Sequence, residues 1–339
     1  METLTRLFRN LCVLIFIFNC NIAKSQNSDA ASDLKFSEMI AKYENTKDRL
    51  ALNYLYILGA NNEKVLQWLE NNLSSDLDIL HAAGQAFAKS KFPTWSNKAE
   101  KILIKSLEFN PKSYTANTLG DIYIKKDSRK ACDFYEKAYK IESNNIGNEE
   151  FAFCLMTDVT DRSYRKSDVE ACEILKIISK EYIEFFGKYE SWEAGRVFYF
   201  LGGCLSSNKL SLSKMKNPKE AVEWYKRGMN NGHEWSAFTY AEHLESGIGV
   251  LRDPRGAIQA YNKAATLGLN VAQNRLGIIY AEGELAPKNI PEAYKWFLIA
   301  TANGYEAAKD NRTRAESRLS RAEIRSAESS AKQWLKENQ

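Results

Sequence analysis

The sequence lacks the short motifs that mark most catalytic and cofactor-binding sites. It holds only three histidines, and no second histidine follows His233-Glu234 at the spacing that a zinc site on one helical turn requires. It contains no G-x-S-x-G nucleophile turn and no P-loop, and Gly247 and Gly249 are followed by Arg252 where a dinucleotide fingerprint needs a third glycine. We therefore expect no enzyme activity, no cofactor and no metal.

Clustered positive charge is missing as well. The chain has 47 Lys and Arg against 43 Asp and Glu, a net charge of +4 in 339 residues, and the two signs are interspersed. A nucleic-acid-binding face needs positive charge gathered on one side, so no nucleic acid partner is expected. With 44% hydrophobic residues, the chain can bury a large core or form one extended array.

The sequence also has no apolar run long enough to span a bilayer, which takes about 20 residues. The run Leu11–Phe18 is shorter, follows two arginines and precedes the small residues of Ala23-Lys24-Ser25. These features predict a secretory signal peptide over residues 1–25, cleaved before Gln26, and a periplasmic or secreted mature chain without a transmembrane segment.

Lipidation of Cys20 after export is a second interpretation of the same segment. A lipoprotein signal normally has small residues just before its cysteine, whereas this chain has Phe18 and Asn19 there. Cleavage near Ser25 is therefore the preferred interpretation.

One helical pattern recurs at a spacing of 36 residues. It is "NPKEAVEWYKRGMNNG" at 217–232, "DPRGAIQAYNKAATLG" at 253–268 and "NIPEAYKWFLIATANG" at 289–304. In each segment an alanine and an aromatic residue four positions later share one helical face, which predicts packing against a neighbour. Asn217, Asp253 and Asn289 are expected as N-caps, and Gly232, Gly268 and Gly304 as the residues that end the helices.

A second helix precedes each of the last two patterns. Residues 272–283, "AQNRLGIIYAEG", place Ala272, Leu276 and Tyr280 on one face, with Gly277 allowing close approach, and residues 236–250 keep this spacing. Because two antiparallel helices cannot bury both apolar faces alone, the units are expected to stack. The predicted fold is all-α: an α/α superhelical solenoid of antiparallel helix pairs.

Residues 236–304 resemble the Sel-like repeat (SLR) family, whose units read A-x3-LG-x2-Y-x2-G-x-G-V and then D-x3-A-x3-Y-x2-A-x3-G. The chain departs from this pattern at Tyr240-Ala241, in place of Leu-Gly, and at Leu285, where the second loop glycine belongs. Upstream, residues 98–111 and 115–139 resemble tetratricopeptide units with shorter loops. The expected organisation is a signal peptide at 1–25, a helical region at 26–97, tetratricopeptide-like irregular repeats at 98–216, Sel-like repeats at 217–304 and C-terminal capping helices at 305–339.

Four cysteines remain in the mature chain, and an even number in an oxidising compartment favours disulfides. Three pairings are possible. The segments around Cys132 and Cys172 are in register, as are those around Cys154 and Cys204. This register predicts the pairs Cys132–Cys154 and Cys172–Cys204, each joining the second helix of one unit to the first helix of the next.

The resemblance implies a non-catalytic scaffold that binds a protein partner through its concave face. In tetratricopeptide-like arrays, residues of the first helix of each unit, two before and two after the Leu-Gly pair and one near the helix start, line that face. The corresponding positions are Tyr114, Asn117, Asp121, Tyr199, Trp235, Phe238, Glu242, Asn274 and Ile278. Residues 181–203 are rich in aromatics, most of them expected in the core, and Tyr199, Trp235 and Phe238 are predicted to form an aromatic patch that binds the partner.

The family suggests two alternatives. Exported SLR proteins of this size occur as immunity proteins that neutralise secreted antibacterial effectors, such as lipases. Cysteine-rich relatives are described as β-lactam-binding hydrolases, whose S-x-x-K motif occurs at Ser163–Lys166, Ser211–Lys214 and Ser329–Lys332. The companion S-D-N and K-T-G elements are absent, so these three matches carry little information.

Overall fold

We describe the protein from a computed structural model. The described residues are 29–73, 77–143, 147–156, 167–186 and 191–338, and every regular element among them is helical. The expected signal peptide, Cys20 and the motif at residues 163–166 lie outside them.

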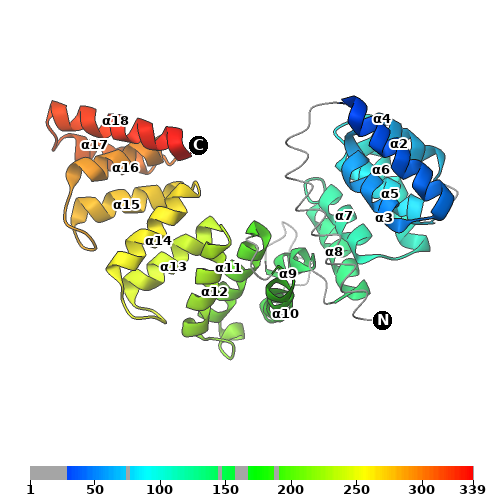
Figure 1. The fold of residues 1–339 in the computed structure, drawn as a ribbon. Coiled ribbons are helices and arrows are strands. Elements are labelled where there is room, and N and C mark those ends of the chain that lie inside the picture. Colours follow the sequence, from blue (N-terminus) through cyan, green and yellow to red (C-terminus); the bar gives the residue numbers. More distant parts are fainter. Residues whose placement is uncertain (1–28, 74–76, 144–146, 157–166, 187–190, 339) are drawn as a thin grey trace. The chain divides into compact units, whose positions relative to one another are not determined.

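The chain divides into two units, residues 1–165 and 166–339. Unit 1 contains α2 (Asp29–Thr46), α3 (Arg49–Leu58), η1 (Gly59–Asn61), α4 (Glu63–Asn71), α5 (Leu77–Lys89), α6 (Pro93–Phe109), α7 (Ser113–Tyr123), α8 (Ser128–Ile141) and α9 (Glu149–Met156). Unit 2 contains α10 (Asp168–Phe186), α11 (Trp192–Ser206), η2 (Leu210–Leu212), α12 (Pro218–Asn230), α13 (Glu234–Ser246), α14 (Pro254–Thr266), α15 (Asn270–Glu282), α16 (Ile290–Ala302), α17 (Ala308–Glu316) and α18 (Arg321–Asn338) (Figure 1).

The repeated helices of unit 2 begin and end where the sequence pattern predicts. The side chains of Asn217, Asp253 and Asn289 each accept a hydrogen bond from the backbone N–H three residues later, which satisfies a donor that the first helical turn leaves open. Gly232 and Gly268 follow α12 and α14 in the left-handed region, with φ of 78° and 94°. Glycine adopts this conformation without steric cost, so each helix ends at a defined residue.

Small residues let the two helices of a pair approach each other closely. A methyl group on Gly202 of α11 would lie 2.6 Å from the Tyr225 ring of α12, and one on Gly277 of α15 would lie 2.4 Å from the Phe297 ring of α16. The aromatic ring of the second helix thus lies directly on the glycine of the first. The pairs α11–α12, α13–α14 and α15–α16 stack along the chain and bury their alanine-rich faces, as the predicted solenoid requires (Figure 1).

In unit 1, helix pairing begins earlier than the sequence analysis predicted. Helix α5 packs along α6 as α7 packs along α8, and Gly84 contacts Leu103 in the way that Gly202 contacts Tyr225. The stretch 26–97 therefore contains the first helix of a pair, and α6 begins at Pro93 rather than near residue 98.

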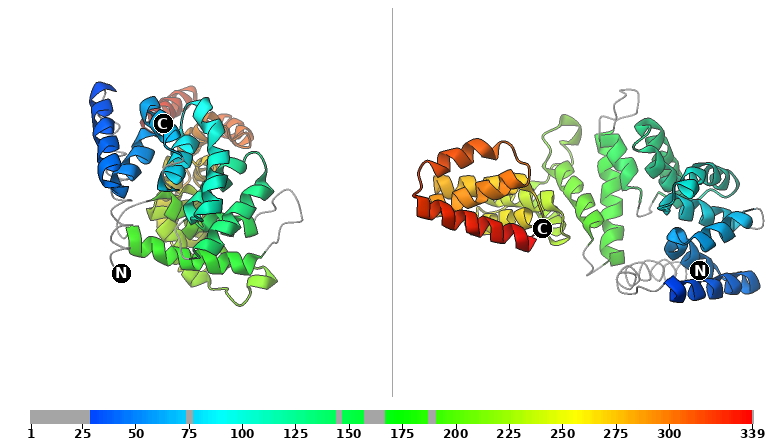
Figure 2. Two further views of the ribbon diagram at one scale, coloured as in Figure 1. Left: turned by 90° about the vertical axis from the view of Figure 1, so that its right-hand side faces the viewer. Right: turned by 90° about the horizontal axis from the view of Figure 1, so that it is seen from above.

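The last two helices cover the end of the solenoid. Both α17 and α18 pack on α16, and α18 runs along it at the C-terminal end of unit 2 (Figure 2). Their inward residues, Ala308, Ala315, Ala327 and Ala331, are buried, whereas most of their other residues are exposed and polar. A terminal repeat needs such a polar-backed cover for its apolar face.

Two disulfides tie successive helices together. Cys132 of α8 is bonded to Cys154 of α9 in unit 1, and Cys172 of α10 is bonded to Cys204 of α11 in unit 2. These are the two pairs that the repeat register predicts. All four cysteines are buried, so the bridges lie in the interior between neighbouring helices.

Candidate interaction surface

The three predicted partner-binding residues of unit 1 lie on α7, and each has a contact within the unit. Tyr114 is 45% exposed, and its ring centroid lies 4.1 Å from that of His81 on α5. The Asn117 side-chain amide donates to the Gly147 carbonyl over 3.0 Å, and the exposed Asp121 carboxylate accepts from the Tyr135 hydroxyl over 2.9 Å. Asn117 and Asp121 therefore have roles in packing, and Tyr114 presents the most side-chain surface.

In unit 2, α11, α13 and α15 are the first helices of their pairs. Trp235, at the start of α13, is 39% exposed. Its ring lies 6.0 Å from that of Phe238, which in turn lies 5.4 Å from Tyr261 of α14. Tyr199 of α11 is half-buried, with its ring 5.1 Å from His233. The structure thus brings Tyr199, Trp235 and Phe238 onto adjacent helices.

Sequence reasoning missed Trp192, the first residue of α11. This side chain is 46% exposed, and its indole N–H donates to a Glu234 carboxylate oxygen over 3.0 Å. Its ring lies 5.4 Å from that of buried His233, which also contacts Tyr199. We call Trp192, Tyr199, Trp235 and Phe238 the aromatic cluster.

The other aromatics of the stretch 181–203 whose side chains the structure describes are buried or half-buried. Tyr182 and Phe198 are buried, as the prediction of a mainly structural role requires. Helix α11 packs against α10 and α12, and this packing determines which of its aromatic side chains are buried. No feature of the sequence distinguished exposed Trp192 from its buried neighbours.

Carboxylates surround the aromatic cluster. Glu193 and Glu242 are exposed beside it, and Glu234 is held by Trp192. Partial burial, and then the neighbouring Glu245 carboxylate, raise the pKa of Glu242. Burial also raises the pKa of the Tyr199 hydroxyl, and Glu242 raises it further. Two cations lie near these groups: Arg196, 5.8 Å from the Trp192 ring, and Arg275, which pairs with Glu245 and partly offsets the raised pKa of Glu242.

The two predicted residues of α15 have a different environment. Asn274 is only 9% exposed, and its side-chain oxygen accepts from Asn311 of α17 over 3.1 Å. It is covered by the capping helix and is not available to a partner. Ile278 is half-buried and packs against the apolar cluster of Tyr294 and Phe297. The repeat register aligned these residues with solvent-facing positions of other repeats. The register does not show that α17 packs over this part of α15.

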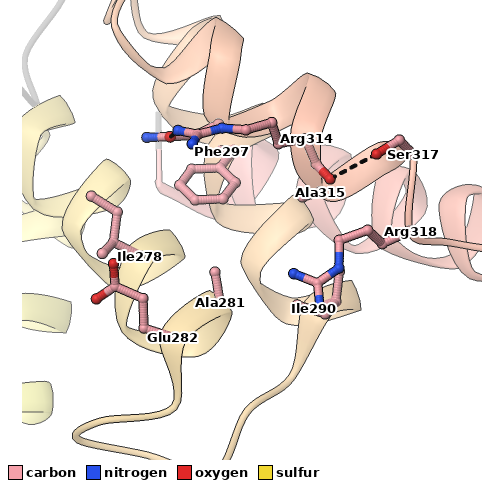
Figure 3. Close-up of a pocket in the computed structure, with 10 residues that line it drawn as sticks. Ile278, Ala281, Glu282, Ile290, Phe297, Arg314, Ala315, Ser317 and Arg318 are labelled. Carbon is pink, nitrogen blue, oxygen red and sulfur yellow. Dashed lines mark hydrogen bonds between the residues drawn. The ribbon is translucent and has the colours of Figure 1, made fainter.

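A cavity of about 440 Å³ lies between α15, α16 and α17. Figure 3 shows Ile278, Ala281 and Glu282 on the α15 side, the Arg314 side chain extending above the Phe297 ring, and the Arg318 guanidinium beside Ile290. The remaining lining residues are Ile290, Phe297, Asn311, Ala315 and Ser317. Sequence reasoning did not anticipate this cavity, because it depends on how the cap docks.

The S-x-x-K serines in the described part of the chain do not line the cavity beside α17. Ser211 and Ser329 are exposed, as are Lys214 and Lys332, and none of the four lines the cavity beside α17. Within the described residues, no group of three His, Cys, Asp or Glu side chains could hold a metal ion. No helix in the same part of the chain is long and apolar enough to cross a membrane.

Stacked antiparallel helix pairs with a polar cap define an α-solenoid, a class of repeat proteins that present extended binding surfaces. The family model of the Sel1 repeat matches residues 118–141, 199–233, 236–269 and 270–305. These four segments are therefore similar to Sel1 repeats, and the chain as described has an α-solenoid fold.

Two solved structures share this fold. One is c5321, described as a protective antigen present in uropathogenic Escherichia coli strains displaying an SLR fold, with 21% identity and a TM-score of 0.69. The match covers 88% of this chain and 63% of c5321. The other is a Sel1 repeat protein from Oxalobacter formigenes, with 18% identity, a TM-score of 0.60 and 92% of each chain covered.

Proposed function

We propose that the protein is an exported scaffold that binds a protein partner through the aromatic cluster of unit 2. The observation that carries this proposal is the exposure of two tryptophans, Trp192 and Trp235, on adjacent first helices. Large rigid aromatic side chains lose little conformational entropy on binding, and tryptophan is enriched among the residues that dominate interface energies. Two exposed indoles on adjacent helices are more typical of a binding surface than of a face that contacts only water.

Two independent features support export. The two disulfides suit an oxidising compartment and are rare in the reducing cytoplasm. The first 25 residues have the charge and apolar pattern of a secretory signal. Both are consistent with a periplasmic or secreted protein.

The charges around the cluster indicate the chemistry of the partner. Because Glu193 and Glu234 lie beside Trp192 and Glu242 lies near Tyr199, the cluster attracts a surface that combines apolar side chains with lysine or arginine. A cation over an indole ring also gains a cation–π interaction. Association is therefore expected to weaken with rising salt, and Glu242→Gln is expected to slow it.

The test compares partner capture by variants of the full mature chain. The immobilised wild type, a Trp192→Ala/Trp235→Ala variant and a Phe109→Ala control are exposed to envelope and secreted fractions of the native organism. Phe109 is 64% exposed and lies in unit 1, so the control removes a similar apolar area elsewhere. The double variant is expected to lose about thirtyfold in affinity or more for the partner that the other two retain.

Thermal melting separates binding from packing. A double variant that melts at the wild-type temperature and loses the partner supports the proposal. A folded double variant that retains full affinity would show that the partner binds another surface. If the partner is a toxic secreted effector, rescue of growth on co-expression identifies the scaffold as an immunity protein.

A further inference from the structure

The cavity beside α17 combines an apolar floor with two cationic side chains that lie apart. Ile278, Ala281 and Phe297 form the floor. The cavity is also lined by the apolar residues Ile290 and Ala315. The Arg314 side chain extends above the Phe297 ring, whereas the Arg318 guanidinium lies beside Ile290, so the two groups do not converge (Figure 3). Its volume of about 440 Å³ is within the range of small-ligand pockets, about 300–1,000 Å³.

Arg314 is held in place by a chain of side-chain hydrogen bonds. Its guanidinium donates to the Asn311 side-chain oxygen over 2.5 Å, and the Asn311 amide donates to Asn274 over 3.1 Å. Because Asn274 is buried, this chain anchors the guanidinium to the interior of α15. A guanidinium has five N–H donors, so one bond to Asn311 leaves others for a ligand.

The charges on the walls favour an anion near α17. Arg314 and Arg318 carry two positive charges there, and the acidic lining residue, Glu282, lies on the α15 wall. Guanidinium groups bind carboxylates through parallel N–H···O bonds, a geometry that a lysine does not offer. The hydrocarbon of the same ligand would contact the apolar floor.

From this arrangement we propose that the cavity binds an amphipathic carboxylate: a carboxylate group held by Arg314, attached to an aliphatic portion that lies on Ile278 and Phe297, with the charge of Arg318 adding a weaker attraction. Two sources supply this chemistry, a free medium-chain fatty acid and the C-terminal residue of a peptide with an aliphatic side chain. The site is separate from the aromatic cluster, so its test does not depend on the proposed partner interface.

Calorimetric titration of the full mature chain tests the site with probes for both sources. Sodium octanoate represents the fatty acid, and N-acetyl-leucine represents the peptide end. N-acetyl-leucinamide has the same aliphatic group without the carboxylate and serves as the negative control. Saturable binding of octanoate alone identifies a fatty-acid site, and binding of N-acetyl-leucine with no binding of its amide identifies a peptide-end site.

Matched variants assign the binding to the cavity. Arg314→Gln is expected to weaken carboxylate binding about tenfold and Arg318→Gln to weaken it less, whereas Arg325→Gln, at an exposed arginine of α18 outside the cavity, is expected to leave binding unchanged. Ala281→Leu fills the floor and is expected to abolish binding. Glu282→Gln removes the opposing negative charge and is expected to strengthen it.

The proposal is overturned if neither carboxylate binds, or if binding persists in a folded Arg314→Gln/Arg318→Gln variant. Both arginines are exposed, so these substitutions are expected to leave the melting temperature unchanged. If the double variant melts at a lower temperature, the carboxylate affinities of Ala281→Leu and Glu282→Gln provide the test. The first is expected to lose binding and the second to bind more tightly, and any other result overturns the proposal.

Discussion

Trp296 of α16 packs edge-on against Trp334 of α18, with ring centroids 5.4 Å apart and ring planes at 68°. This contact packs the capping helix α18 against α16, the second helix of the last repeat. Trp296 is buried, so the loss of its partner would expose apolar surface of the repeat itself.

Trp334→Ala is therefore expected to lower the free energy of unfolding by about 2 kcal/mol, because it removes a half-buried ring and leaves a gap over Trp296. Urea unfolding measures the change. Lys336→Ala, an exposed neighbour on the same helix, is the control and is expected to change stability by less than about 0.5 kcal/mol. Equal effects of the two substitutions would show that α18 does not cap the array.

The adjacent glycines of α11 offer a matched test of helix packing. A methyl group at Gly202 would meet the Tyr225 ring, whereas one at Gly203 has no heavy atom within 4 Å. Gly202→Ala is expected to destabilise by about 1–3 kcal/mol through overpacking. Gly203→Ala is expected to be neutral or to stabilise by up to about 1 kcal/mol, since alanine favours helix. Thermal melting of both variants checks the difference, and equal shifts would contradict the close contact.

His81 makes the stability of unit 1 dependent on pH. Burial, and then the charge of Lys112, lower the pKa of this histidine from 6.5 to about 3. The folded state thus holds His81 neutral while the unfolded chain protonates it, so acid favours unfolding. Stability is highest above pH 6.5 and falls as the pH drops from 6.5 toward 3, by about 2 kcal/mol at pH 5.

His81→Gln is expected to remove most of this loss, because glutamine can bond Thr115 as His81 does but does not titrate. Urea unfolding of the wild type and the variant at pH 7 and pH 5 gives the comparison. An unchanged difference between the two pH values would assign the acid sensitivity to other groups.

The disulfides are tested in exported protein by peptide mapping without reduction. We expect the pairs Cys132–Cys154 and Cys172–Cys204, and four free thiols would refute the assignment. Replacing both members of either pair by alanine is expected to lower the free energy of unfolding by about 2–4 kcal/mol, since each bridge limits the unfolded chain.

Where the sequence repeats itself, it predicted the helices closely. The caps Asn217 and Asp253 and the stop Gly232 are local signals, and local backbone chemistry determines where a helix begins and ends. The α5–α6 pair was missed, although Gly84 precedes Gly120 by 36 residues, because no Leu-Gly pair marks it.

The binding surface was harder to predict, because exposure depends on what packs over a position. Tyr199 lies on α11 and contacts His233, and Trp235 contacts Phe238 on α13, because neighbouring repeats place these residues on adjacent helices. Asn274 has an equivalent register but is covered by α17, and Trp192 stands at a helix start outside the repeat pattern. Both outcomes depend on contacts between distant segments, which periodicity does not encode.

The Cys172–Cys204 bridge has a consequence for how unit 2 responds to force. In a stacked array each repeat contacts only its neighbours, so unfolding starts at an end and proceeds repeat by repeat. The bridge locks α10 to α11 at one end, whereas α17 and α18 at the other end are held by side-chain contacts alone. When the chain is pulled, unit 2 is therefore expected to unravel from its C-terminal cap, and the 31 residues between the bridged cysteines contribute no extension until the bond is reduced.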